Sequence, residues 1–388
     1  MHRIYYKRRH DDPQEHIIHD LDSQAVVLSY EIKQSLDAVW TCEFELSLDN
    51  PFYNEIDPIN GLIKVVNVLD GAIEFEGRVL QPTSRMSAQN GFVKTFICES
   101  YLAYLNDSTQ TYLKFSNTGV KNYIQNILAK HNAQVEPHKQ MHAGNVTVQD
   151  SDNYPDNYIG YDNTFDTLKT FLKDRLGGKF AVRKVRDVLY LDYFNLSDLG
   201  TYSQTPLELG KNVKSARRTV NFDEMITRLV PLGDAVENTG NNEDVPDGQQ
   251  TTQERITIAS VNGGKIYIED PALIRHFGII QRPMEFEYTK TPAELLKKAQ
   301  NKMAQQAIAL ASWEVEVTDL SLIDSNYDKL EVGNFHPVVI LPLSGVEQLQ
   351  IVEKVISSNS PQNVKLVVGD IRQTFTAYQA QPFNRLGG

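Results

Sequence analysis

Two stretches of the chain follow the same order of β-strand signals, and this internal repeat constrains the fold more than any other sequence feature. Each stretch starts at one of the only two tryptophans and continues through glycine-led apolar runs. The paired landmarks, which keep nearly constant spacing, are Trp40 with Trp313, Gly61 with Gly333, Gly71 with Gly345 and Val93 with Val364. We interpret them as a duplicated β-module. The alternative is two unrelated β-regions with ordinary turns.

The first hundred residues alternate between apolar and polar side chains. Apolar residues lie on alternate positions in three runs, which are Leu28, Tyr30 and Ile32, then Trp40, Cys42, Phe44, Leu46 and Leu48, and then Ile73, Phe75 and, beyond Gly77, Val79. Alternation with a period of two buries one face of a strand and leaves the other wet. It predicts an antiparallel barrel or sandwich over residues 1–107.

The following residues, 108–206, carry helical as well as strand signals. Helical spacing links Val120, Tyr123, Ile124, Ile127 and Leu128, and then Phe165, Leu168, Leu172 and Leu176. Gly177 and Gly178 should end the second helix, because glycine accepts the left-handed conformation of a helix C-terminus. Residues 179–185 and 188–194 predict a hairpin, so this region is expected to be α+β.

The chain returns to β-structure after residue 206. Residues 236–312 should hold β segments, a polar mobile loop at 238–253 and a helix at 291–311 that Thr291 caps and Pro292 opens. That helix should bury Leu296, Ala299, Met303 and Ala307. A second β-barrel module is expected at 313–375, and residues 376–388 resemble a frayed tail or a truncation point.

Composition narrows the class of protein. The 388 residues carry a net charge of −12, which disfavours unspecific binding to DNA phosphates and would suit a wall along which DNA slides. No run has the length of an apolar membrane helix, and the N-terminus lacks a signal peptide, so we expect a cytosolic site of synthesis. The only cysteines, Cys42 and Cys98, are expected to be buried free thiols. They could form a disulfide only if their strands are adjacent.

A search for catalytic or metal-binding motifs yields no site residues. His138 and His142 have zinc-like spacing, but Pro137 and Gly144 favour a solvated loop. The remaining weak candidates are His16 with His19, Asp150 with Asp152 and Asp156, Gly177-Gly178-Lys179, and Gly263-Gly264-Lys265. Each is better explained by surface residues, a hydrated loop or a tight turn. The sequence therefore predicts no enzyme, no cofactor, no catalytic residue and no metal ligand.

A series of short motifs occurs in one order along nearly the whole chain. They are Trp40 to Leu48, residues 74–79, 97–105, 164–168, 176–180 and 209–213, then Thr227-Arg228-Leu229-Val230-Pro231-Leu232-Gly233, residues 256–265 and 267–270. In this order the chain resembles the N-terminal structural region of the tail-associated lysin family of long-tailed bacteriophages. That family is also called prophage tail endopeptidase or minor structural protein, and it is similar to the baseplate hub of contractile-tailed phages.

The resemblance implies a β-rich α+β fold with two similar antiparallel β-barrel domains and further α/β parts. It also implies that residues 207–235 can return to the first barrel. It implies a homotrimer at the tail tip, in which three chains with two barrels each could face a sixfold tail tube. The implied partners are the distal tail protein and tail tube, the tape measure protein and a receptor-binding adhesin. Phage DNA would pass through without specific binding, and no stable membrane anchor is expected.

The chain departs from longer family members, because it ends about where they continue into a hydrolase or adhesin region. Endopeptidase activity is therefore not expected of it. We expect a structural hub that connects the tail tube to the adhesion device and gates the DNA channel. It would be located in the virion tail tip, and in the host cytoplasm during assembly. The alternatives are a tail-associated peptidoglycan hydrolase and the hub of a contractile injection machine.

Overall fold

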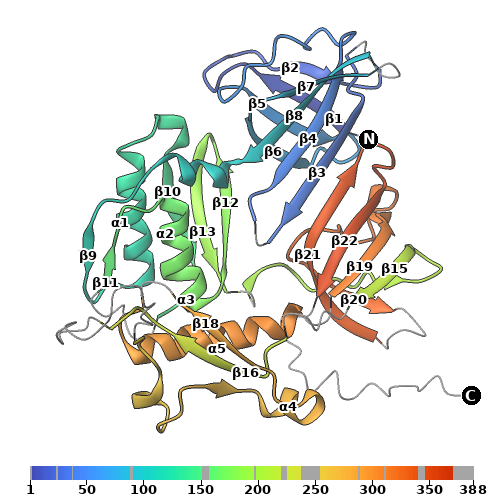
Figure 1. The fold of residues 1–388 in the computed structure, drawn as a ribbon. Coiled ribbons are helices and arrows are strands. Elements are labelled where there is room, and N and C mark those ends of the chain that lie inside the picture. The colour runs from blue at the N-terminus through green and yellow to red at the C-terminus, as the bar shows by residue number, and fades with distance from the viewer. Residues whose placement is uncertain are drawn as a thin grey trace, which may run out of the picture. The chain divides into compact units, whose positions relative to one another are not determined.

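The computed structural model describes residues 2–22, 25–36, 38–87, 91–150, 157–195, 198–219, 225–236, 254–286, 289–309, 312–339 and 346–369. The chain forms two compact units (Figure 1). Unit 1 contains residues 1–169, 178–219 and 312–370, and unit 2 contains residues 170–177, 220–311 and 371–388. The predicted mobile loop at 238–253 and the tail at 376–388 lie outside the described residues.

The first β-module of unit 1 contains strands β1 to β8. They are β1 (His2–Lys7), β2 (His16–His19), β3 (Ser29–Ser35), β4 (Thr41–Ser47), β5 (Leu62–Asn67), β6 (Ile73–Val79), β7 (Thr83–Ser87) and β8 (Gly91–Ser100). Hydrogen bonds join them in the order β3-β4-β8-β6-β5-β1-β2, and all of these pairs are antiparallel. The predicted alternation is visible in β4, where Cys42, Phe44 and Leu46 are fully buried.

The second β-module of unit 1 repeats this strand order. Its strands are β14 (Leu207–Glu208), β15 (Val213–Thr219), β19 (Ser312–Thr318), β20 (Phe335–Val339), β21 (Val346–Ser357) and β22 (Asn363–Gly369). The order β15-β19-β22-β21-β20 matches β3-β4-β8-β6-β5, again with antiparallel pairs throughout. The duplication predicted from the sequence is therefore confirmed at the level of strand order.

The two modules differ at the far end of the path. β14 pairs with β20 in parallel, whereas β1 pairs with β5 antiparallel. Among the described strands no pairing joins β2 back to β3, so closure into a barrel stays a prediction. The sequence allowed residues 207–235 to return to the first module, but β14 and β15 pair with β20 and β19 of the second module instead. The reason is that β15 pairs with β19 in the second module in the way that β3 pairs with β4 in the first.

Several single residues depart from the expected alternation. Leu28, Leu48 and Ile73 are 51%, 60% and 55% exposed, because they lie at or beyond strand ends where alternation no longer directs them inward. The tryptophans are not in equivalent settings either. Trp313 lies within β19 and is fully buried, whereas Trp40 precedes β4 and donates from its ring nitrogen to the carbonyl oxygen of Ser35. The two modules thus share topology rather than a fixed residue register.

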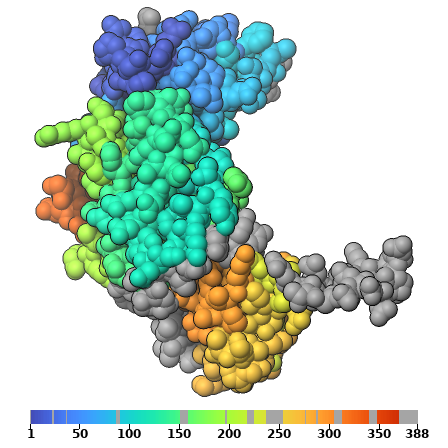
Figure 2. Space-filling model, turned by 90° about the vertical axis from the view of Figure 1, so that its left-hand side faces the viewer, coloured from blue at the N-terminus to red at the C-terminus, as the bar shows by residue number. Residues whose placement is uncertain are grey.

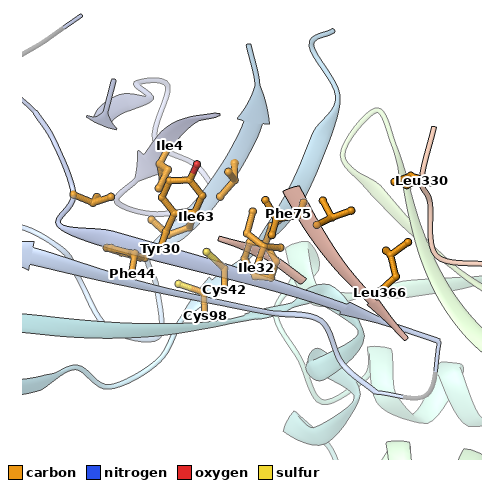
Figure 3. Packing of buried hydrophobic residues seen from close by; sticks show 14 of the residues in the cluster. Ile4, Tyr30, Ile32, Cys42, Phe44, Ile63, Phe75, Cys98, Leu330 and Leu366 are labelled. Carbon is orange, nitrogen blue, oxygen red and sulfur yellow. The ribbon is translucent and has the colours of Figure 1, made fainter. Parts of the chain in front are cut away.

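One hydrophobic cluster runs through both modules. It joins Ile32, Phe44 and Phe75 of the first module to Trp313 and Leu366 of the second. Figure 3 shows Ile32, Phe44 and Phe75 of the first module, with Leu330 and Leu366 on the side of the second module. Apolar burial contributes about 25 cal/mol for each Å² removed from water, so this shared cluster stabilises the contact between the two modules.

The α/β part of unit 1 follows β8. It contains the 3₁₀ helices η1 (Tyr101–Asp107) and η2 (Pro137–Lys139), helices α1 (Val120–Asn132) and α2 (Thr164–Leu168), and strands β9 (Leu113–Phe115), β10 (Met141–Val146), β11 (Asn157–Ile159), β12 (Lys179–Val185) and β13 (Val188–Phe194). The expected hairpin is β12–β13, and β13 also pairs with β10 in parallel. All five residues of the first predicted helical stripe, in α1, are buried.

The second predicted helix is not regular. After α2 the helix continues as a wider π-helical turn, η3 (Lys169–Lys173), and ends with the short α3 (Asp174–Leu176). The wider turn moves the buried face, so Phe171 and Leu172 are both buried. Gly177 and Gly178 end the helix with φ of 76° and 79°, as the sequence predicted.

Unit 2 is built around one small sheet and one long helix. Strand β16 (Arg228–Leu232) pairs with β17 (Ile268–Glu269) and β18 (Gln281–Glu285), and the helices are α4 (Pro271–Phe277) and α5 (Pro292–Ala309). α5 begins at Pro292, and the Glu294 amide donates to Thr291 at 3.3 Å, as expected of the cap. Leu295 is fully buried and Leu296 only partly so, which corrects the predicted stripe by one position. Ala299 and Met303 pack in the unit's core as predicted, while the side chain of Ala307 lies outside the described set.

No helix in the described part of the chain combines the length and apolar character needed to span a membrane. The fold is β-rich α+β with large antiparallel sheets, as predicted.

Candidate functional site: the junction of the two β-modules

The two β-modules join edge to edge within unit 1. Strand β3 of the first module pairs antiparallel with Glu353–Ser357 at the end of β21 (Figure 1). Ile32 and Ile356 lie opposite each other and are fully buried. Because β3 also pairs with β4, and β21 with β22, the junction makes one continuous sheet across both modules.

Charged and polar groups fix the alignment of the junction. The Lys354 ammonium lies 3.3 Å from the Glu74 carboxylate, and these side chains are only 6% and 13% exposed. The Gln34 amide donates to the carbonyl oxygen and to the carboxylate of Glu74, at 2.7 and 3.2 Å. A buried ion pair with a further hydrogen bond is costly to break by removing one partner. It therefore selects one arrangement of β3, β6 and β21.

A linker from the α/β part passes over the second module. Gly200 has a φ of 75°, and a Cβ built on it would lie 1.9 Å from the carbonyl oxygen of Gly333. Next to it the Thr201 amide donates to the Asn334 side chain at 2.9 Å, and the ring of Tyr202 stacks on Phe335 at 4.7 Å. The two backbones can approach this closely only where the residue has no side chain.

A groove of about 690 Å³ lies beside the junction, between the first module and β12. Apolar side chains, among them Trp40, Phe75, Phe180 and Val182, line it together with charged ones such as Lys179 and Lys184. Burial lowers the pKa of Lys179 to about 8. A groove that combines apolar side chains with several charged groups of both signs is suited to binding an extended, amphipathic segment.

The α/β part is attached to the first module by a cluster of ions around Arg78. Its guanidinium bonds Asp107 at 2.5 and 2.8 Å and Glu99 at 2.7 Å, and Lys139 lies 3.1 Å from Asp107. Burial opposes the charge on Arg78, but its two carboxylate partners raise its pKa. Lys184 of β12 adds a contact to Glu76 of β6 at 2.7 Å, and Figure 2 shows the green α/β part lying against the blue module. The geometry is that of a structural clamp.

The structure places the weak histidine candidates apart from one another. His138 lies in η2 and His142 in β10, so they do not share a helix face. His138 stacks instead on His10, with ring centroids 3.9 Å apart, whereas His142 lies 5.9 Å from the ring of Tyr190. His19 is buried and accepts from the Val27 amide, while His16 lies 5.6 Å from the ring of Phe52. Within the described ranges no three His, Cys, Asp or Glu side chains gather as metal ligands would.

Those of the remaining candidates that lie in the described part of the chain also occupy structural positions. Asp150 is buried, and Asp152 and Asp156 lie outside the described residues. Gly263 and Gly264 have φ of 61° and 83°, in keeping with the predicted tight turn. Cys42 and Cys98 lie opposite each other on β4 and β8, as the sulfur atoms in Figure 3 show, so their strands are adjacent. Both are free and fully buried, and burial raises the pKa of each thiol.

Several histidines of unit 1 are held neutral by burial. The pKa of His2 falls to about 3, chiefly through burial, and its ring lies 2.9 Å from the Tyr30 hydroxyl. Burial likewise lowers the pKa of His19, His131 and His336. His131 contacts the hydroxyl of Ser108 at 2.7 Å, and His336 contacts the carbonyl oxygen of Thr205 at 3.0 Å. These groups serve the fold, since each is fixed by a neighbour.

Sequence reasoning did not find the junction residues Lys354, Glu74 and Gln34. One usable signal was present, because the strand pattern from Val346 to Ser357 is 12 residues long and exceeds the length of its partners. A strand that is longer than its partners within the module has backbone N–H and C=O groups left to pair with another strand.

Comparisons with known proteins support a phage-tail relationship. Residues 201–379 match the model of the family described as "Prophage endopeptidase tail". None of the curated proteins matches the sequence. The 43 kDa tail protein of prophage MuSo2 from Shewanella oneidensis has a similar structure, with a TM-score of 0.63, 15% identity, and coverage of 95% of this chain and 98% of that one.

Two further structures extend the comparison. The tail protein from Neisseria meningitidis MC58 matches with a TM-score of 0.62, 12% identity, and coverage of 95% of this chain and 96% of that one. An E. coli component of the type VI secretion system, described as structurally similar to T4 bacteriophage tail proteins gp27 and gp5, matches with a TM-score of 0.50. Its identity is 9%, and the match covers 90% of this chain and 74% of that one. The resemblance inferred from the sequence is confirmed: residues 201–379 carry the pattern of the prophage endopeptidase tail family, and the chain has the fold of prophage tail proteins.

Proposed function

We propose that this chain is a structural hub at the tip of a phage or prophage tail. The observation that carries the proposal is the repeated strand order of the two β-modules, joined through β3 and β21. Three copies of a chain with two similar modules present six similar units. A trimer could thereby match a sixfold tail tube through nearly equivalent contacts.

In this role the chain would connect the tail tube and distal tail protein to a receptor-binding adhesin, and it would gate the channel for DNA. The tape measure protein would be a further partner. The net charge of −12 supports a channel wall that does not retain DNA. The proposed location is the virion tail tip, after assembly in the host cytoplasm.

Measurement of native mass by light scattering tests this proposal. We expect about three times the chain mass of 44.0 kDa at high protein concentration, with dissociation on dilution because trimer stability depends on protomer concentration. A protein that remains monomeric at millimolar concentration would contradict the hub.

Two other functions have a specific observation in their favour. The description of the matching family includes endopeptidase activity, which supports a peptidoglycan hydrolase. Clearing of a host cell-wall zymogram by the purified chain would favour this function over the hub. The likeness to a type VI secretion component supports the hub of a contractile injection machine. A sheath gene beside this one, or a spike protein bound to its trimer, would favour that role.

A further inference from the structure

The strand positions that form the junction between the modules occur twice in the repeat. In the described part of the chain only one of the two sets of positions is paired. β3 is the first strand in the order of the first module, and it pairs with β4 on one edge and with β21 on the other. β15 has the same place in the second module and pairs with β19. In the described part of the chain the other edge of β15 has only an isolated bridge, between Val213 and Leu209. β15 is therefore an edge strand in the position where β3 is a central one.

In the first module, the strand that corresponds to the receiving end of β21 is also an edge strand. β21 runs along β22, and its last residues, Glu353–Ser357, receive β3. In the first module β6 and β7 lie one after the other along β8: Gly77–Val79 faces its end and Thr83–Ser87 its start. β7 thus corresponds to the last part of β21. Among the described strands it pairs with β8 alone.

We propose that β15 of one copy of this chain pairs antiparallel with β7 of a second copy, as β3 pairs with β21 within one chain. The proposal rests on the proposed function, since the hub trimer supplies the second copy, and it adds the surface through which the copies meet. Unpaired backbone N–H and C=O groups on an edge strand are a template for another strand. The contact is head-to-tail, so repeated contacts generate a ring when the rotation closes.

The side chains on both edges allow this pairing. Lys214 and Arg217 are exposed on β15, and charged residues on an edge strand often discourage pairing. However, β3 carries Lys33 and still pairs with β21, where Lys33 lies 3.0 Å from the carboxylate of Glu353. On β7 the charge of Arg85 is balanced by Glu45 at 2.6 Å. The intrachain junction therefore shows that this kind of edge accepts a partner.

Cross-linking between two differently labelled chains tests the proposal. A chain with Ser215→Cys is co-expressed with a chain carrying Ser84→Cys, because both serines are exposed, and a short bismaleimide is added. Cys42 and Cys98 are 0% exposed and should not react. We expect a shift to the mass of two chains on a denaturing gel, with the cross-link between residues 84 and 215 in the peptide map. Lys214→Cys with Arg85→Cys is the second pair, one residue back on β15 and one residue further on β7, as antiparallel pairing requires, and both positions are exposed.

The matched control replaces Ser215→Cys by Thr111→Cys, an exposed position outside the two β-modules, and no two-chain product is expected from it. A trimer by light scattering that gives no product with either pair would overturn the strand pairing while leaving the proposed function intact. A product from either single variant alone would mean that like edges meet, which overturns head-to-tail contact. A monomer at high concentration would overturn both proposals.

Discussion

At the scale of single residues, Gly200 is where the structure tolerates a side chain least. The Gly200→Ala variant should lose about 3–4 kcal/mol of unfolding free energy, because its Cβ would meet the backbone of Gly333 and its φ of 75° is left-handed. Gly71→Ala is the matched control, since Gly71 has a φ of 74° with nothing within 4 Å of a Cβ, and about 1–2 kcal/mol is expected. Urea unfolding measures both, and equal losses would show that the close backbone contact does not exist.

The buried His2 makes stability depend on pH. Its pKa is about 3 in the folded chain against an ordinary 6.5. Between these two pH values His2 is therefore protonated in the unfolded chain and neutral in the folded chain. The His2 contribution is therefore fully present above pH 6.5 and is lost as pH falls toward 3. The slope of unfolding free energy against pH should fall by up to about 1.4 kcal/mol per pH unit in His2→Phe.

The measurement is urea unfolding between pH 7.5 and pH 5, above the range where most carboxylates take up protons. Tyr30→Phe is the control, because it removes the hydroxyl that contacts His2 and keeps the buried imidazole. This variant should be less stable by a similar amount at every pH, with the slope unchanged. An unchanged slope in His2→Phe would mean that His2 is not buried as described.

At the scale of elements, two ion pairs at the junction of β3 and β21 should differ in strength. Lys354→Met should cost about 2–4 kcal/mol, since it leaves the Glu74 carboxylate buried without its cation. Lys33→Met removes the partner of Glu353 on the same pair of strands, but Lys33 is 50% exposed, so less than about 1 kcal/mol is expected. Denaturant unfolding of the two variants compares them, and similar losses would mean that burial does not decide the strength of these pairs.

The strands could be predicted from sequence far better than their edges. Alternation in Thr41–Ser47 and helical spacing in Val120–Asn132 report which face of an element is buried, and both were confirmed. The length of Val346–Ser357 signals that β21 has a further partner, but it does not identify β3 as that partner, because backbone hydrogen bonds carry no side-chain signature. For the same reason the ion pair of Lys354 with Glu74, which are 280 positions apart, has no local pattern.

At the scale of the whole molecule, the repeat determines what can be inferred about assembly. Sequence landmarks showed that two modules exist, and the structure shows that they share strand order while residue register drifts between them. Core packing constrains topology and the alternation of faces more tightly than exact positions. A trimer that presents six similar surfaces can therefore keep the fold of every module while the two modules of each chain diverge in sequence.

The charge of the whole molecule leads to a prediction about DNA. A net charge of −12 on each chain repels the phosphate backbone, and a trimer would carry three times that charge. We expect no shift of linear double-stranded DNA in a native gel with the full chain at micromolar concentration. The test is most stringent at about 50 mM salt, because electrostatic binding to phosphates strengthens steeply as salt is lowered. A shift that weakens with added salt would reveal a basic surface that the net charge conceals, and DNA would then be held by this protein rather than slide past it.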